Sequence, residues 1–298
     1  MTANRAPSTV VAGGRGAVGT MLVELLRSDG QQVVVADPRD ERGLDITRPD
    51  DALDAALGDA DSALLAVPET VARAATVVLR DRLRPGALLV ETLSVKSRVA
   101  ESIRALGTPA VGINPMYAPA LGMAGRPVLA VVHHPGAAVE VFLDLLRRAG
   151  ATVVPVTAAE HDRLCAATQA ATHASVLALG LALADLDAGT EASLAAAPPP
   201  HTLTLALLAR ITLGSPAVYW DVQAANPFAR EARAALAAGL DRLSRVCESG
   251  TEAEFAALMA QARGRLGEHA PHYGDLCAAL FDALPLPLGV RTAGGRTP

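Results

Sequence analysis

The chain has 298 residues, enough to form two domains with separate hydrophobic cores. Its net charge of −5, without a basic block, argues against nucleic acid or an anionic membrane surface as a partner. The three cysteines show no metal-ligand or disulfide spacing, and the N-terminus has no signal-peptide pattern, so we expect a cytoplasmic protein without a bound metal. The longest apolar stretch, residues 174–184, is too short to span a bilayer.

The first half of the chain alternates short apolar runs with helical patterns, as in a parallel sheet that helices cover on both faces. The predicted strands are 9–12, 33–36, 62–67, 87–90, 110–113, 128–132 and 153–156. The predicted helices between them are 20–27, 50–57, 71–82, 98–106 and 137–149. This order predicts a Rossmann-type, doubly wound α/β domain over residues 1–157.

A glycine-rich loop after the first strand is typical of a dinucleotide site. It reads Gly14-Arg15-Gly16-Ala17-Val18-Gly19, a G-x-G-x-x-G between a strand and a helix. Its glycines permit a tight turn, close approach to a pyrophosphate and close helix–strand packing. Val67 and Pro68 end the third strand at the same edge of the sheet and are also expected to contact the cofactor.

The second strand ends at Asp37, whose carboxylate can accept hydrogen bonds from both hydroxyls of the adenosine ribose. The same carboxylate would repel a 2′-phosphate, so the sequence predicts NAD rather than NADP. Arg39 and Arg42 lie close enough along the chain to soften that preference.

From residue 158 onward the chain is rich in Ala and Leu and reads as helices only. The predicted helices are 160–186, 202–211, 216–225, 227–248 and 252–281. We therefore predict an all-helical domain over residues 158–284 and a flexible tail over 285–298. Long apolar helices of this kind often bury a surplus face in a partner subunit, so we expect a homodimer.

Several separated motifs share the order and spacing of one family. They are Ser94-Val95-Lys96, Gly112-Ile113-Asn114-Pro115-Met116, Glu160-His161-Asp162 with Gln169 and His173, and Arg210 with Ser215-Pro216, Trp220-Asp221 and Asn226. With these motifs the chain resembles the prephenate dehydrogenase family from about Val10 to Leu284. The resemblance implies an NAD-linked oxidative decarboxylation of a small dienyl dicarboxylate, in which a ring carbon loses hydride, carbon dioxide departs and the ring becomes aromatic. It also implies that the helical domain binds the substrate.

The resemblance further implies roles for individual residues. Arg210 would pair with the ring carboxylate, because its planar fork suits a planar anion. His173 and Gln169 would hydrogen-bond the pyruvyl end of the substrate. Ser94 would lie between cofactor and substrate and orient the reacting carbon. Lys96 would steady this strand end or the substrate anion.

We expect structural roles for the remaining histidines. We expect His161 and Asp162 to cap the long helix and orient its start. The histidines that match no motif are expected on the surface or in packing: His133, His134, His201, His269 and His272.

Position 114 departs from the family pattern, which has a His-Pro pair whose histidine accepts the proton of the ring hydroxyl. Here the residue is Asn114, and an amide cannot act as a general base near neutral pH. General-base assistance is worth roughly 10²–10⁴ in rate, so its loss would slow a hydroxylated substrate.

A ring amine would need no such base, because hydride loss gives an iminium, a far weaker acid than a protonated carbonyl. The Asn114 oxygen can accept one amine N–H, whereas a protonated histidine would repel a partly cationic amine. The sequence therefore favours 4-amino-4-deoxyprephenate, which would give 4-aminophenylpyruvate, a precursor used in antibiotic-type secondary metabolism.

Two alternatives remain open. Asn114 could be a neutral change in an enzyme for prephenate or arogenate, with Ser94 or a water assisting the reaction. The chain could also be an NAD-binding sensor without turnover. The presence of all four residues Ser94, Gln169, His173 and Arg210 argues against that second alternative.

Overall fold

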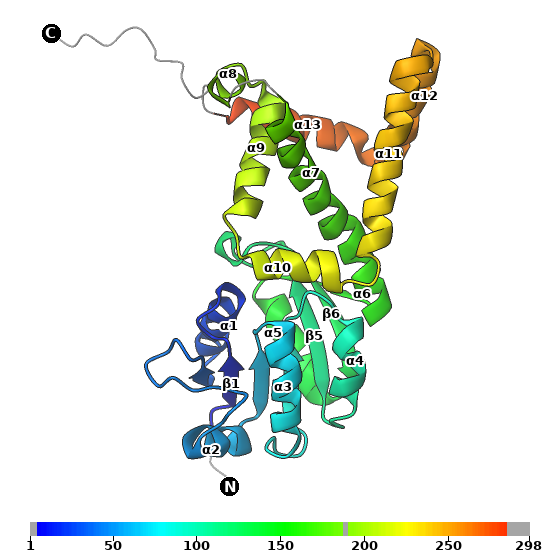
Figure 1. The fold of residues 1–298 in the computed structure, drawn as a ribbon. Helices are drawn as coiled ribbons and strands as arrows, with labels where there is room; N and C mark the ends of the chain where they lie inside the picture. Colours follow the sequence, from blue (N-terminus) through cyan, green and yellow to red (C-terminus); the bar gives the residue numbers. More distant parts are fainter. Residues whose placement is uncertain (1–4, 187–189, 285–298) are drawn as a thin grey trace, which may run out of the picture. The chain divides into compact units, whose positions relative to one another are not determined.

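Figure 1 shows the computed structural model of the chain, which describes residues 5–186 and 190–284. The predicted tail over 285–298 lies outside the described residues. By contacts the chain forms two compact units, Met1–Cys165 with Ala224–Pro227, and Ala166–Gln223 with Phe228–Pro298. The division therefore falls at Cys165, inside a helix, whereas the sequence predicted it at residue 157.

The first unit contains a seven-stranded sheet in the order β2-β1-β3-β4-β5-β6-β7. The strands are β1 (Ser8–Ala12), β2 (Gln32–Ala36), β3 (Ser62–Leu65), β4 (Leu88–Glu91), β5 (Ala110–Pro115), β6 (Pro127–His134) and β7 (Thr152–Pro155). The strand order reverses on either side of β1, which is the doubly wound topology that the sequence predicted. Crevices at the carboxyl ends of strands beside such a reversal are the usual ligand sites.

Helices cover both faces of this sheet (Figure 1). They are α1 (Ala17–Ser28), α2 (Asp51–Asp59), α3 (Glu69–Arg80), α4 (Ser97–Arg104) and α5 (Ala137–Arg148). Apolar residues of α2, α3 and α4 pack in one buried cluster, and those of α1 and α5 pack in another. Successive strand residues alternate between the clusters, because Val10 and Ala12 belong to the first and Val11 to the second. Both faces of the sheet are thus buried, as the short unbroken apolar runs predict.

One pair of strands departs from the predicted parallel arrangement. β6 pairs with β5 in the antiparallel sense, and the other neighbouring pairs are parallel. The connection from β5 to β6 contains only a single 3-10 turn, Pro119–Leu121. A parallel neighbour would need a crossover of a dozen or more residues, usually a helix, so this short link produces the antiparallel pair.

From Ala158 onward, the described part of the chain is mainly helical. It comprises α6 (Ala158–Cys165), a π-helical turn (Ala166–Ala170), α7 (Ala171–Asp185), α8 (Thr190–Ala195), α9 (Pro199–Thr212), α10 (Pro216–Trp220), a second π-helical turn (Asp221–Ala225), α11 (Ala229–Ser249), α12 (Glu252–Gly264) and α13 (Ala270–Asp282). The single helix predicted over 252–281 is wrong, because the chain breaks between α12 and α13. Gly267 adopts a left-handed φ of 56°, and Pro271 lies in the first turn of the next helix.

The helical unit buries few of its apolar side chains. Within the described residues, its buried cluster consists of Ala170, Val222 and Ala229. Large apolar side chains that stay exposed in the single chain include Leu181, Leu213, Leu240, Met259 and Leu276. Contrary to the expectation from residues 174–184, the continuous helix Ala158–Asp185 is also long and apolar enough to cross a bilayer, by length and composition alone.

Candidate active site

The nucleotide loop lies at the carboxyl end of β1 and leads directly into α1, whose N-cap is Gly16. Gly13 makes the tight turn with a φ of 76°, and a Cβ there would collide with the carbonyl oxygen of Ala66. A Cβ at Gly19 would collide with the carbonyl oxygen of Gly13. The first N–H groups of α1 have no partner within the helix, and in the loop before them, Gly13 to Gly16, Arg15 alone carries a side chain, a geometry suited to phosphate. The sequence motif begins at Gly14 and does not indicate the left-handed turn at Gly13.

Asp37 follows β2 at the same edge, and its side chain is buried. Oδ2 accepts hydrogen bonds from the Arg15 backbone N–H at 3.0 Å and from Arg39 Nη2 at 3.0 Å. Oδ1 accepts from the Arg39 backbone N–H at 2.9 Å and from Arg39 Nε at 3.1 Å. The Arg39 hydrogen bonds hold the pKa of Asp37 below its ordinary value, although burial opposes them. The Arg39 side chain is 69% exposed, so it can yield its place to a ribose hydroxyl.

The other predicted cofactor contacts lie at the same sheet edge. Val67 follows β3, and its γ carbon lies against the position that a Cβ on Gly13 would take. Pro68 is the N-cap of α3. Ser94 follows β4 and is half-buried. Because β1, β3, β4 and β5 run parallel, the carboxyl end of β5 with Asn114 belongs to this edge too.

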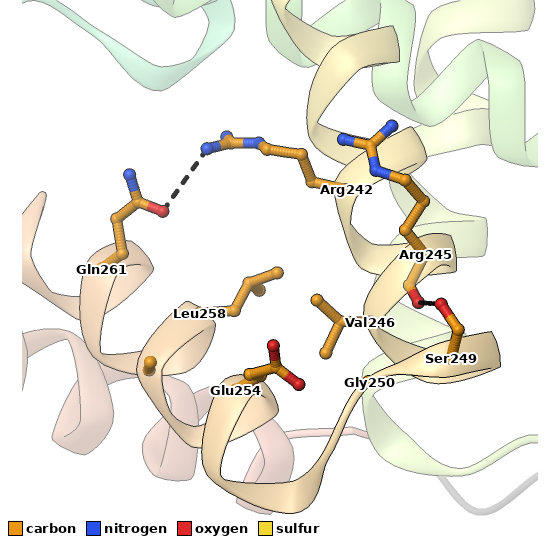
Figure 2. A pocket seen from close by; sticks show the side chains of 9 residues that line it. Arg242, Arg245, Val246, Ser249, Gly250, Glu254, Leu258 and Gln261 are labelled. Carbon is orange, nitrogen blue, oxygen red and sulfur yellow. Dashed lines mark hydrogen bonds between the residues drawn. The ribbon is translucent and has the colours of Figure 1, made fainter.

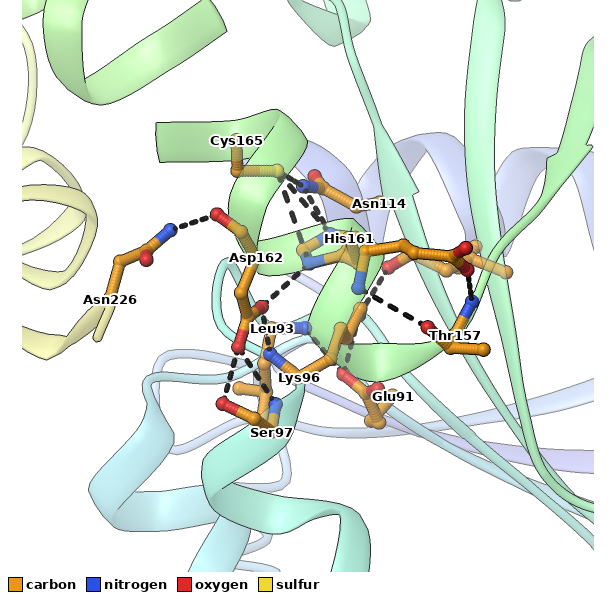
Figure 3. A network of polar contacts seen from close by, with 12 residues as sticks. Glu91, Leu93, Lys96, Ser97, Asn114, Thr157, His161, Asp162, Cys165 and Asn226 are labelled. Atoms are coloured by element: carbon orange, nitrogen blue, oxygen red, sulfur yellow. Dashed lines mark hydrogen bonds and ion pairs between the residues drawn. The ribbon is translucent and has the colours of Figure 1, made fainter. Parts of the chain in front are cut away.

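Asn114 is buried and contacts two residues of α6 (Figure 3). Its Nδ2 lies 3.0 Å from Nε2 of His161 and 3.5 Å from Sγ of Cys165. Nδ1 of His161 lies 2.8 Å from Oδ1 of Asp162. The three side chains Asp162, His161 and Asn114 thus form a chain of hydrogen bonds. No donor among the described residues bonds the Asn114 amide oxygen.

Asp162 also closes the N-terminus of α4. Its Oδ1 accepts the Lys96 backbone N–H at 2.8 Å, and its Oδ2 accepts the Ser97 backbone N–H at 3.0 Å and the Ser97 hydroxyl. The expectation that His161 and Asp162 cap the long helix is therefore wrong. The start of that helix is closed by Thr157 and Glu160, which exchange hydrogen bonds between side chain and backbone.

Burial and hydrogen bonds together set the charge of this group. Burial would raise the pKa of Asp162, but hydrogen bonds from His161, Lys96 and Ser97 outweigh it and hold that pKa below its ordinary value. Burial lowers the pKa of His161, although Asp162 opposes the effect. Burial raises the pKa of the Cys165 thiol to about 11. Near neutral pH the group therefore holds a carboxylate, a neutral imidazole and a protonated thiol.

A second buried group lies beneath the strand ends. Lys96 is completely buried, and its Nζ donates to Oε2 of Glu91 at 2.7 Å and to the carbonyl oxygen of Ile113 at 2.8 Å. Nε2 of His133 donates to Oε1 of Glu91 at 2.9 Å. With no exposed area, Lys96 is placed to join β4 to β5, and the structure gives its ammonium no open path to a substrate anion. His133, predicted on the surface or in packing, is buried, and it is also a polar partner of Glu91.

The predicted substrate residues of the helical unit lie on three different elements. Gln169 is in the first π-helical turn, His173 is on α7, and Arg210 is in the last turn of α9. The His173 ring meets the Tyr219 ring edge-on, with 4.9 Å between centroids. Burial, and secondarily the charge of Arg210, lowers the pKa of His173. Nδ1 of His173 is buried and has no hydrogen-bond partner among the described residues, so it remains available to a ligand.

A cavity of about 580 Å³ lies elsewhere, in the hairpin of α11 and α12 (Figure 2). Arg242, Arg245 and Ser249 line it from α11, and Glu254 and Gln261 line it from α12. Nη1 of Arg242 donates to Oε1 of Gln261 at 3.4 Å. None of the predicted site residues lines this cavity, so we do not assign it to catalysis.

Comparison with known proteins identifies relatives of the chain. Residues 157–261 match a family model described as prephenate dehydrogenase, dimerization domain. A 4-amino-4-deoxyprephenate dehydrogenase of Streptomyces pristinaespiralis is 50% identical over 92% of this chain and 96% of its own length.

Solved structures share the fold. Arogenate dehydrogenase of Synechocystis matches with a TM-score of 0.68 and 19% identity, over 88% of this chain and 99% of that chain. Prephenate dehydrogenase of A. aeolicus, in complex with hydroxyphenyl propionate and NAD+, matches with a TM-score of 0.68 and 17% identity, over 89% of this chain and 98% of that chain.

Proposed function

The chain belongs to the prephenate dehydrogenase family, and we propose that it catalyses the NAD-dependent oxidative decarboxylation of 4-amino-4-deoxyprephenate to 4-aminophenylpyruvate. The relative of that specificity shares half of its residues with this chain over nearly the full length of both. The proposal makes the protein an oxidoreductase that acts on a small dienyl dicarboxylate.

The choice of substrate rests on the hydrogen bonds of the Asn114 side chain. Its amide nitrogen is engaged with His161 and Cys165, and no described donor bonds its oxygen. An oxygen in that state can accept an N–H from a ring amine, but it cannot remove a proton from a ring hydroxyl. Among the described residues the imidazole in contact with Asn114 is that of His161, and it is itself bonded to both Asn114 and Asp162.

The glycine loop and Asp37 fit NAD. Side chains at Gly13 or Gly19 would collide with backbone, so the loop keeps the bare surface that a pyrophosphate needs. Asp37 offers an ionised carboxylate for the ribose once Arg39 moves aside. When bound, NAD accepts the hydride from the ring carbon that carries the amine.

In this proposal the residues of the chain hold the substrate in place, and the bonding changes take place within the substrate. Asn114 accepts one amine N–H and so keeps the nitrogen lone pair directed at the ring carbon. Loss of hydride leaves an iminium, the ring carboxylate leaves as carbon dioxide, and its electron pair restores the aromatic ring with a neutral amine. The step needs no proton acceptor at the amine, which agrees with an amide at position 114.

The roles of the helical unit follow the family resemblance. We assign Arg210 to the ring carboxylate and His173 with Gln169 to the pyruvyl group. The orphaned Nδ1 of His173 and the charge of Arg210 nearby support an anionic ligand at this place. Ser94 would orient the reacting carbon.

We assign the exposed apolar faces of the helical unit to a second copy of the chain. Within the described residues α12 and α13 bury no side chain, so these helices lack a core of their own. The matched dimerization model covers residues 157–261, which include the whole of the membrane-length helix Ala158–Asp185 and all of α12 apart from its last turn. A dimer would bury this surface without a membrane, in keeping with a cytoplasmic protein. Light scattering on the purified protein should give twice the mass of one chain.

The function is tested by mixing the purified protein with NAD and each of three substrates, 4-amino-4-deoxyprephenate, prephenate and arogenate, while the absorbance of reduced cofactor is followed. We expect the highest kcat/KM with the amino substrate. Faster turnover of prephenate or arogenate would reassign the enzyme to tyrosine synthesis. NAD binding without turnover of any of the three would favour a sensor.

A further inference from the structure

The Asn114 amide can present either of two faces to a ligand, because its oxygen and its NH₂ group have nearly the same shape. With the oxygen facing the ligand, position 114 accepts a hydrogen bond, and with the nitrogen there it donates one. We propose that His161 and Asp162 are positioning residues that fix this amide with its oxygen toward the substrate, and that they thereby set the preference for a ring amine. This inference rests on the proposed function.

The orientation begins at Asp162, which is completely buried and cannot turn. Three donors hold its carboxylate: the backbone N–H groups of Lys96 and Ser97, and the Ser97 hydroxyl. These contacts keep Asp162 ionised, as its lowered pKa also indicates. A carboxylate can only accept, so the nitrogen of His161 that faces it must carry a proton.

The position of the proton on His161 in turn fixes the orientation of the Asn114 amide. A neutral His161 with its proton on Nδ1 has a lone pair on Nε2. The group 3.0 Å from that lone pair must therefore be the NH₂ of Asn114, since the amide oxygen would place two acceptors against each other. Sγ of Cys165 lies 3.5 Å from the same amide nitrogen and accepts weakly from it. The amide oxygen is left on the opposite side, with no bond from the described residues.

The surroundings keep His161 neutral. The charged or titratable groups around it are Asp162 on its own helix, Cys165 one turn later, and Lys96 and Glu91 from the sheet. Lys96 and burial disfavour a second proton on the ring, whereas Asp162 and Glu91 favour one, and the balance lies on the neutral side. A doubly protonated ring would donate from Nε2, turn the amide over and present its NH₂ group to the substrate amine, donor against donor.

The test compares His161→Phe, which keeps a planar ring but removes the lone pair, with His161→Gln, whose side-chain oxygen can replace it. The readout is the ratio of kcat/KM for 4-amino-4-deoxyprephenate to that for prephenate. The ratio should fall about tenfold in His161→Phe, the value of one ordinary hydrogen bond, and recover in His161→Gln. Cys165→Ala is the comparison variant, because it removes the weak thiol acceptor of the amide but leaves the lone pair of His161, so it should lower the ratio much less than His161→Phe does.

A second measurement is independent of turnover and of how well a variant folds. Nitrogen-15 NMR of the unaltered protein at neutral pH should show His161 protonated at Nδ1 and bare at Nε2. A proton on Nε2, or an unchanged substrate ratio in a folded His161→Phe protein, would overturn the inference.

The outcomes also separate this inference from the proposed function. An enzyme that prefers the amino substrate but keeps its ratio in His161→Phe retains its function and loses the positioning role. An enzyme that prefers prephenate while its ratio still depends on His161 keeps the positioning role and loses the proposed substrate.

Discussion

Replacing Lys96 with methionine removes one charge from a pair that has no access to water. The ammonium and its partner Glu91 are both buried, with 2.7 Å between Nζ and Oε2. Methionine fills a similar volume, so the variant leaves Glu91 without its buried counter-ion, and Ile113 without a donor to its carbonyl oxygen. Removing one member of a buried ion pair typically costs about 3–5 kcal/mol, and we expect the free energy of unfolding to fall by that amount.

The loss should depend on pH. In the native protein burial would raise the pKa of Glu91, but Lys96 and His133 outweigh burial and hold it below the ordinary value. The carboxylate therefore stabilises the fold above the unfolded-state pKa of about 4.3. In Lys96→Met burial dominates, the pKa rises, and the ionised carboxyl destabilises the fold at neutral pH. The difference between the two proteins should be largest near pH 7 and should narrow as the pH falls toward the ordinary glutamate value.

Urea denaturation at one fixed protein concentration measures these differences and avoids the effect of dimer dissociation. Arg104→Met is the matched control, because Arg104 lies exposed on α4, and it should change stability by no more than about 0.5 kcal/mol. The double variant Lys96→Met/Glu91→Gln should recover part of the loss. A loss below about 1 kcal/mol in Lys96→Met, or one that does not vary with pH, would refute the reasoning.

Three further predictions concern the ligands. Asn114→His should raise kcat/KM for prephenate relative to the amino substrate, by up to the roughly 10²–10⁴ that a general base contributes, and an unchanged ratio would remove position 114 from the choice of substrate. Arg210→Ala should raise KM for the dicarboxylate about 10- to 100-fold, the value of a charge-assisted hydrogen bond, and steady-state kinetics with KM unaltered would exclude Arg210 from substrate binding. Gly19→Ala should weaken NAD binding in calorimetry, because the added methyl group would push Gly13 out of the loop, and wild-type affinity would show that the loop tolerates the side chain.

The parts of the fold that follow from the sequence are those whose signals are local. Each strand of the sheet is a short apolar run, and the glycine loop with Asp37 lies within one strand–helix–strand unit. Asn114 can be recognised from the sequence because it stands in a contiguous motif where the family pattern has a histidine. Its contact with His161, 47 positions away, has no such signal, because only the tertiary fold brings the end of β5 to α6.

Where the sequence interpretation was wrong, a longer-range or competing effect decided the structure. The run of Ala and Leu over 252–281 concealed the break at Gly267, although glycine and proline marked it. β6 is antiparallel to β5 because the connection between them is short, and an apolar run does not indicate whether a strand pairs parallel or antiparallel. The pairing of His133 with a buried carboxylate also depends on where β6 lies, and no local pattern indicates it.

The buried group of Glu91, Lys96 and His133 requires a glycine at position 112 of β5. A methyl group at this position would occupy the space of Glu91 Oε1 and crowd His133 Nε2. Gly112→Ala would displace the Glu91 carboxylate and leave Lys96 without its buried counter-ion, although the substitution changes no ionisable residue. The glycine at position 112 therefore leaves the space that the buried carboxylate of Glu91 occupies on the neighbouring strand.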